Sequence, residues 1–150
     1  MDIAFTNYVN SDFNVLIEMI FGLYEEDHVG LPMTMEKIKK TVDTCIRNPQ
    51  KVQIVIIRCG DIIIGYGLIT FLWSNEYGGD VLDIDEIYVK KGYRNKKVAT
   101  RFIKHILETH KNVVLFELEA TPSNKSAIAL YKSLGFEVSA NLHLRRTAIP

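Results

Sequence analysis

Side chains capable of proton transfer and anion binding are concentrated between Asp80 and Ala99. An extended, acid-rich stretch, DVLDIDEIYV, runs into a basic turn, KKGYRNKKVA, which opens an amphipathic helix. The first N–H groups of a helix have no intrahelical partner, and the helix dipole favours an anion at that end. A strand that enters a helix through a basic, Gly-containing turn is therefore suited to hold a phosphate. The strand adds carboxylates that can accept protons, so the pattern favours an enzyme.

The composition favours one globular domain over residues 1–150. Of the 150 residues, 47% are apolar and 24% are charged, which suffices for one hydrophobic core but not comfortably for two. The 18 basic and 18 acidic residues cancel, so no overall field attracts nucleic acid or an anionic membrane. The N-terminus has no signal-peptide pattern, and no run approaches the roughly 18 apolar residues of a membrane span. We therefore expect a cytoplasmic protein without nucleic-acid or membrane partners.

The cysteines and histidines form neither a disulfide framework nor a metal-ligand pattern. Cys45 and Cys59 are far apart, and each lies within an apolar pattern, so both are expected to be buried free thiols. The four histidines are scattered without the spacing of metal ligands. The sequence therefore predicts no metal.

The apolar periodicity predicts an α+β arrangement around one sheet. Asn10, Ser11 and Asp12 are expected to cap the first helix, and Gly60-Asp61 to join two antiparallel strands. Helices are predicted over about 13–25, 35–46, 98–110 and 127–134. Strands are predicted over 2–9, 52–59, 62–73, 81–89 and 113–120, with a last hairpin over 136–139 and 142–147.

Two segments of the chain resemble the signature segments of a known enzyme family. YVKKGYRNKKVATRFIKHI and, further along, NKSAIALYKSLGF are similar to the signatures of the GNAT superfamily of N-acetyltransferases. Members of this superfamily move an acetyl group from acetyl-coenzyme A (acetyl-CoA) to an amine. The resemblance implies acetyl-CoA as co-substrate, and a mixed, mostly antiparallel central sheet of six to seven strands flanked by about four helices.

The resemblance implies that the cofactor is bound by the end of the acidic strand and by the basic turn. The family's turn reads Gln or Arg, two residues, Gly, one residue, then Gly or Ala; Arg94 and Ala99 fit it, while Lys97 replaces the first glycine. We expect an ordinary negative φ at Lys97, which lets its side chain add a charge near phosphate; alternatively, its Cβ displaces the cofactor. The implied cofactor-binding residues are Ile87, Tyr88, Val89, Arg94, Asn95, Lys96, Lys97, Val98, Ala99, Thr100, Asn124 and Lys132.

The family's chemistry requires a group that removes a proton from the amine, whose pKa lies near ~10. We rank the candidate bases Asp85, then Glu86, then Asp83. Strict strand alternation puts Asp83 and Asp85 on one face and Glu86 on the other, although a bulge, which the family generally has, would shift that phase. The resemblance implies that Tyr131 protonates the departing thiolate and that the Val89 amide holds the thioester carbonyl. Packing into the core is the alternative role for Tyr131.

Several acids could form a mouth that attracts a cationic amine such as a polyamine, an aminoglycoside or a lysine side chain. Solvation of a helix end is an equally good explanation for part of this set. The residues assigned to acceptor binding are Glu25, Glu26, Asp27, Glu76 and Asp83.

Two questions about the whole protein stay open from the sequence. The departure at Lys97 keeps a second function in view, a non-catalytic CoA-binding or regulatory module. An ATP-dependent phosphotransferase is disfavoured, because no Gly-rich loop with Lys-Ser/Thr accompanies the basic turn. The alternating C-terminal segment can pair across a two-fold axis, so a homodimer and a monomer are equally compatible with the sequence.

Overall fold

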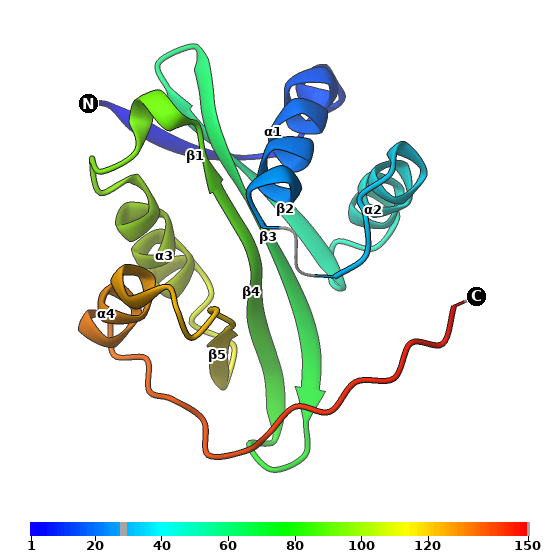
Figure 1. The fold of residues 1–150 in the computed structure, drawn as a ribbon, viewed down its shortest axis with the longest axis vertical. Helices are drawn as coiled ribbons and strands as arrows, with labels where there is room; N and C mark the ends of the chain where they lie inside the picture. The colour runs from blue at the N-terminus through cyan, green and yellow to red at the C-terminus, as the bar shows by residue number, and fades with distance from the viewer. Residues whose placement is uncertain (28–29, 150) are drawn as a thin grey trace. The chain divides into compact units, whose positions relative to one another are not determined.

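The computed structural model describes residues 1–27 and 30–149, and the chain divides into two compact units (Figure 1). The first unit, Met1–Glu119, holds the sheet, and the second, Ala120–Pro150, holds the last helix. In chain order the elements are β1 (Ile3–Asn7), the 3-10 turn η1 (Asn10–Asp12), α1 (Phe13–Glu26), α2 (Met35–Arg47), β2 (Val52–Cys59), β3 (Ile62–Ser74), β4 (Gly79–Val89), the 3-10 turn η2 (Lys91–Tyr93), α3 (Val98–Thr109), β5 (Leu115–Leu118) and α4 (Lys125–Ser133).

The described part of the first unit contains one mixed sheet of five strands in the order β1-β2-β3-β4-β5. Neighbours among the first four strands are antiparallel, while β5 runs parallel to β4. Gly60 and Asp61 join β2 to β3 as the predicted two-residue turn, with a φ of 58° at Gly60 that glycine adopts readily. The predicted α+β class and the mostly antiparallel sheet are confirmed.

The prediction of six to seven strands is wrong for the described residues. The segments 136–139 and 142–147, expected to form a hairpin, have no regular secondary structure. Along them Val138, Leu142 and Leu144 are 78%, 90% and 94% exposed. Alternation favours a strand because it lets one face pack against a neighbour, and these apolar side chains remain in solvent.

Helices cover both faces of this sheet (Figure 1). α1 and α2 bury Leu16 and Ile38 against one face, where they meet Ile56 of β2. α3 lies on the opposite face, where Gly67 of β3 leaves room for the fully buried ring of Phe102. A side chain at Gly67 would overlap that ring. Both faces of the central strands are therefore buried, which explains their long apolar runs.

The chain enters α1 differently from the prediction. Asn10, Ser11 and Asp12 form η1, and Asp12 precedes α1 without accepting a hydrogen bond from it. Instead, Asp12 Oδ2 accepts the Val9 N–H at 3.1 Å, and its Oδ1 lies 2.7 Å from Arg58 Nη2 in β2. Because Asp12 is 3% exposed, its charge needs this partner. The ion pair fastens the start of α1 to the sheet.

In the second unit, α4 has a recognisable cap at each end. Asn124 Oδ1 accepts the Ala127 N–H at 3.2 Å, which is an N-cap. Gly135, with a φ of 91°, ends the helix, and the Phe136 N–H bonds to the Tyr131 carbonyl at 3.1 Å. This is a glycine-dependent helix end.

The two cysteines are free, as predicted, but they are half-buried rather than buried. Over the residues that the structure describes, no helix combines the length and the apolarity needed to cross a membrane.

Candidate active site

Glu86 of β4 is held by two tyrosine hydroxyls that come from different elements. Tyr24 Oη, from the last turn of α1, donates to Glu86 Oε1 at 2.6 Å. Tyr66 Oη, from the middle of β3, donates to Glu86 Oε2 at 2.7 Å. Each carboxylate oxygen therefore has one donor and keeps further lone-pair capacity, because a carboxylate has about four acceptor positions.

A β-bulge in β4 sets the direction of Glu86. Leu68 of β3 pairs with Glu86, and the next pair joins Ile69 to Ile84. Asp85 is thus the extra residue on β4. A bulge of this kind changes which residues of the strand share a face.

The bulge brings Asp83 onto the same face of the sheet as Glu86. Thr70 pairs with Asp83 and Leu68 with Glu86, and Thr70 and Leu68 share a face because they are two residues apart in β3. Strict alternation predicts opposite faces for Asp83 and Glu86, and this prediction is wrong. The bulge, foreseen as the exception, is the physical reason. Asp85 itself is exposed.

Burial raises the pKa of Glu86, and the nearby Asp85 carboxylate raises it further. The hydrogen bonds from Tyr24 and Tyr66 act in the opposite direction, because they stabilise the charged form. The pKa values of both tyrosines are themselves raised, first by burial and then by Glu86, so their hydroxyls stay protonated. A carboxylate with a raised pKa is better matched to accept a proton near neutral pH than an ordinary glutamate.

Past the bulge, β4 extends beyond its pairing with β5. The last described pair between the two strands joins Ile84 to Leu118. Ile87, Tyr88 and Val89 lie further along β4 and still pair with β3 on the other side. The edge past Leu118 can therefore offer backbone N–H and C=O groups to an extended ligand, as an added strand would require.

The basic turn leads from β4 into α3, as the sequence predicts. η2 follows β4 directly, and α3 begins at Val98. Lys96 and Lys97 are exposed in this turn, and Arg94 is half-buried. A helix of this length presents N–H groups and a favourable dipole to an anion at its start.

Lys97 adopts the left-handed backbone conformation, with φ of 60° and ψ of 22°. The prediction of an ordinary negative φ at this residue is therefore wrong. Left-handed geometry costs a residue with a Cβ about 1–2 kcal/mol, whereas glycine adopts it readily. Asn95 also has a φ of 60°, which asparagine tolerates better than most residues. The turn thus keeps a glycine-like backbone at a position occupied by lysine.

Arg94 connects the basic turn, which lies between β4 and α3, to α1 and to β4. Its Nε donates to the Val89 carbonyl at 2.8 Å, and its Nη2 lies 2.8 Å from Glu26 Oε1. The guanidinium carbon also lies 5.4 Å from the centre of the Tyr88 ring, within cation–π range. The predicted phosphate-binding arginine therefore has an acidic partner in this structure.

The acids predicted to bind the acceptor do not all lie together. Glu25, Glu26 and Asp27 are exposed at the C-terminal end of α1. Glu76 lies in the turn between β3 and β4, and the strand between it and Glu86 spans roughly 20 Å. Within the first unit, Glu76 therefore does not join the other acids in one acceptor-binding site.

The predicted site residues of the second unit are Asn124, Tyr131 and Lys132. Tyr131 is half-buried, its ring centre lies 6.3 Å from that of Phe136, and burial raises the pKa of its hydroxyl. Lys132 is exposed in the last turn of α4. The capping role of Asn124 is present, while contacts of these three residues to a cofactor remain predictions.

Tyr24 and Tyr66 are the two site residues that the sequence analysis does not single out. Tyr24 falls within the helix predicted over 13–25, and Tyr66 within the strand predicted over 62–73. A usable signal exists for Tyr66, because a tyrosine in a run of Ile, Leu and Gly must find a partner for its hydroxyl if it is buried. No comparable signal distinguishes Tyr24.

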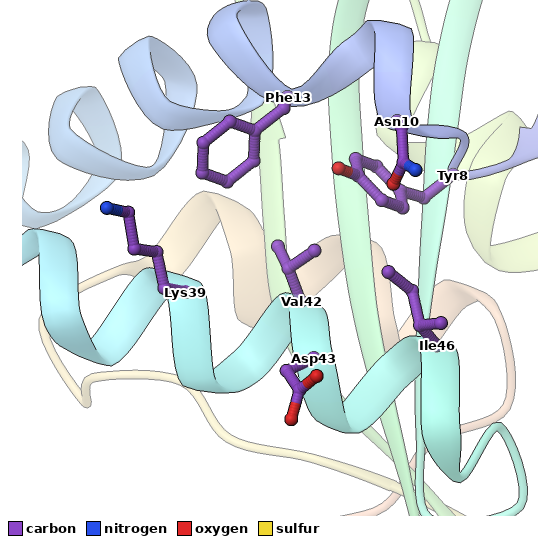
Figure 2. Close-up of a pocket in the computed structure, with 7 residues that line it drawn as sticks. All are labelled: Tyr8, Asn10, Phe13, Lys39, Val42, Asp43 and Ile46. Atoms are coloured by element: carbon purple, nitrogen blue, oxygen red, sulfur yellow. The ribbon is translucent and has the colours of Figure 1, made fainter.

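A groove of about 300 Å³ lies elsewhere in the first unit, between α2 and the segment that leads into α1 (Figure 2). None of the residues predicted to bind or react with a substrate lines it. Its lining residues are Tyr8, Asn10, Phe13, Lys39, Val42, Asp43 and Ile46.

Within residues 1–27 and 30–149, no group of three or more His, Cys, Asp or Glu side chains could hold a metal ion.

The described part of the first unit thus combines a bulged β4, an open strand edge and a basic turn before α3. The model of the acetyltransferase (GNAT) family matches residues 17–136. The chain belongs to this family. The match confirms the family that the two signature segments resemble.

Solved structures support the same fold. A possible acetyltransferase from Clostridium difficile 630 is 24% identical, with a TM-score of 0.80 over 98% of this chain and 99% of that one. AAC(6')-Iy, solved in complex with the bisubstrate analogue CoA-S-monomethyl-acetylneamine, is 15% identical, with a TM-score of 0.80 over 99% of this chain and 100% of that one. At these identities the likeness extends to the fold alone.

Curated relatives match part of the chain. Thialysine N-ε-acetyltransferase of Mus musculus is 37% identical over 78 residues, and that of Sus scrofa is 36% identical over 78 residues. Each match covers 51% of this chain and 45% of the relative. The chain thus spans less than half the length of the curated relatives it matches.

Proposed function

We propose that the protein transfers the acetyl group of acetyl-CoA to a primary amine by direct attack, with Glu86 as the general base. The observation that carries the proposal is the Glu86 carboxylate, which is half-buried, has a raised pKa and lies next to the open edge of β4. Membership of the GNAT acetyltransferase family supports the reaction type. We prefer Glu86 to Asp85 because Asp85 is exposed, whereas Glu86 is half-buried and accepts hydrogen bonds from two tyrosine hydroxyls.

Acetyl-CoA fits the chain at β4 and the turn that follows it. Ile87, Tyr88 and Val89 would hold the pantetheine arm through backbone groups at the open edge. The turn from Arg94 to Thr100, which includes Asn95, Lys96, Lys97, Val98 and Ala99, would hold the pyrophosphate. Acetyl-CoA supplies a thioester whose acetyl group the amine acquires.

The residues then divide the proton transfers between them. Glu86 takes a proton from the ammonium, directly or through water, and leaves a neutral amine able to attack. The Val89 N–H would donate to the thioester oxygen as negative charge develops there. Tyr131 would donate its proton to the sulfur as the C–S bond breaks, and the second proton that the nitrogen loses as the amide forms would pass through water to restore the hydroxyl, while Glu86 releases its proton to solvent.

A small cationic amine is the acceptor class that we favour. Asp83 shares the face of Glu86, and Glu25, Glu26 and Asp27 end the helix that carries Tyr24. Carboxylates in these places favour a second positive charge on the acceptor. The curated relatives are named for acetylation of thialysine, an amine of this kind, so lysine-like molecules, polyamines and aminoglycosides form the first panel.

A second candidate is a non-catalytic CoA-binding module. The left-handed Lys97 favours it, because a side chain replaces a glycine where backbone groups would approach the pyrophosphate.

The test is release of CoA from acetyl-CoA with a panel of thialysine, lysine, spermidine and neamine. We expect turnover with at least one amine. Glu86→Gln should lower kcat/KM by about 10²–10⁴-fold. Asp85→Asn should mainly raise the KM for the amine. Asp43→Asn, a carboxylate substitution on the exposed face of α2, serves as the control. Loss of activity in Asp85→Asn with full activity in Glu86→Gln would refute Glu86 as the base. Binding of acetyl-CoA without turnover would favour the second candidate.

A further inference from the structure

We propose that Tyr66 is a positioning residue for Glu86, holding one carboxylate oxygen fixed so that the oxygen bonded to Tyr24 is the one that takes the proton. This inference rests on the proposed function of Glu86 as the general base. The structure supports it through the two hydrogen bonds and through the different surroundings of the two tyrosines.

Tyr66 is the rigid partner. It is 0% exposed and lies in the centre of the sheet, paired with Ile56 of β2 on one side and with Tyr88 of β4 on the other. Its ring centre lies 6.3 Å from that of Tyr88. Strand pairing on both sides and complete burial fix the Tyr66 ring, and its hydroxyl donates to Glu86 Oε2 at 2.7 Å.

Tyr24 is the exchangeable partner. It is half-buried in the last turn of α1, next to the exposed Glu25 and Glu26. Its bond to Glu86 Oε1, at 2.6 Å, joins the end of α1 to β4, and the Glu26–Arg94 ion pair joins the same end of α1 to the turn after β4. An amine bound at the end of α1, where we propose the acceptor site, would approach Oε1, the oxygen bonded to Tyr24, and would share it with Tyr24 or displace that hydroxyl.

The groups around Glu86 shift its pKa in opposite directions. Loss of a tyrosine hydroxyl should therefore have a measurable effect on that pKa. On β4 Asp85 raises the pKa of Glu86, as burial does, while Tyr24 from α1 and Tyr66 from β3 lower it. Asp27 at the end of α1 acts on Tyr24, raising its pKa further. Removal of the Tyr66 hydroxyl therefore raises the pKa of Glu86 and loosens its carboxylate.

The first measurement is direct and needs no acceptor. The side-chain carboxyl of Glu86 is titrated by carbon-13 NMR in the wild type, in Tyr66→Phe and in the matched control Tyr8→Phe, which removes a hydroxyl at the separate groove. We expect the midpoint to rise by about one pH unit in Tyr66→Phe and to stay unchanged in Tyr8→Phe. An unchanged midpoint in Tyr66→Phe overturns the proposal.

The second measurement is the pH profile of kcat/KM with the best amine of the panel. We expect Tyr66→Phe to move the acidic limb upward by the same amount and to lower kcat about tenfold, with the amine KM unchanged within about twofold. Tyr24→Phe should move the limb and also raise the amine KM. A fall in kcat without a shift of the limb would assign Tyr66 a purely structural role and overturn the proposal.

A double-mutant cycle separates this inference from the proposed function. In the Glu86→Gln background, Tyr66→Phe should cause no further loss, because the group that it positions is gone. Full activity of Glu86→Gln refutes the base assignment, whereas an inactive Glu86→Gln with a normal pH profile in Tyr66→Phe refutes the positioning role alone. Urea unfolding of each variant shows that the fold is retained, since Phe keeps the ring packing.

Discussion

Arg94 and Glu26 form a two-point ion pair, in which Arg94 Nη2 lies 2.8 Å from Oε1 and 2.9 Å from Oε2 of Glu26. The pair joins the basic turn before α3 to the end of α1, where we propose that the acceptor binds. Both side chains are about one-third exposed, 35% and 37%, so water moderates the interaction. An anion that binds Arg94 must compete with Glu26 for the same guanidinium.

Glu26→Gln is expected to strengthen acetyl-CoA binding by about two- to fivefold, the range that a partly exposed ion pair of this kind is worth. The substitution removes the competitor of the phosphate and one negative charge beside it. Calorimetric titration at low salt checks this, and the gain should shrink as salt is added. Asp43→Asn, which breaks the exposed pair with Arg47 on α2, should leave the dissociation constant unchanged. Equal or weaker binding in Glu26→Gln would rule out competition for Arg94.

Lys97→Gly is expected to stabilise the protein by about 0.5–1 kcal/mol. Relief of the left-handed strain at Lys97 exceeds the extra backbone entropy that glycine adds to the unfolded chain. Urea unfolding of Lys97→Gly measures the gain. The control is Lys96→Gly in the same turn, which lies outside the residues with a positive φ and should be neutral or destabilising. A loss of stability in Lys97→Gly would show that the lysine side chain contributes more than its backbone costs.

The elements of the first unit are largely predictable from the sequence, because each is recognisable from its own residues. β2 has the predicted bounds, and the predicted limits of α1 and β3 differ from the structure by one residue. Local periodicity carries this information, since a buried face repeats every second or every third to fourth residue. The C-terminal segment has the same alternation, yet 136–149 forms no strand, because pairing also needs a neighbouring edge that periodicity does not specify.

The active-site geometry depends on relations between distant residues and is only partly predictable. Glu86 is a predicted candidate, but the bulge at Asp85 is a property of the pairing with β3 and decides which acids share a face. The bond from Tyr24 to Glu86 spans 62 residues of sequence, and nothing near Tyr24 indicates its partner. The φ of Lys97 is likewise set by the turn as a whole, since lysine itself disfavours it.

Asp12→Asn is expected to destabilise the first unit by about 2–3 kcal/mol, because it breaks a largely buried ion pair and leaves Arg58 without its charge partner. The side chain of Asp12 is 4% exposed and that of Arg58 is 23% exposed. The midpoint of urea unfolding checks this. Asp43→Asn makes the same chemical change in an exposed pair and should cost less than about 0.5 kcal/mol. Similar losses in the two variants would show that burial of the Asp12–Arg58 pair contributes nothing.

Glu86→Gln is expected to gain stability relative to the wild type as the pH rises from about 4 to 7. The pKa of Glu86 is raised in the folded state above its ordinary value of 4.5, so folding favours the protonated form. The wild type has this contribution in full below pH 4.5 and loses it as the pH rises through the folded pKa, by about 1.4 kcal/mol for each unit of difference. Gln does not titrate, so the difference in unfolding free energy between variant and wild type should be smallest at low pH and largest at neutral pH. Glu36→Gln is the control of opposite sign, because the hydrogen bond from Lys40 lowers the pKa of Glu36. A pH-independent difference for Glu86→Gln would contradict a raised pKa at Glu86, and with it the basis for choosing this carboxylate as the proton acceptor.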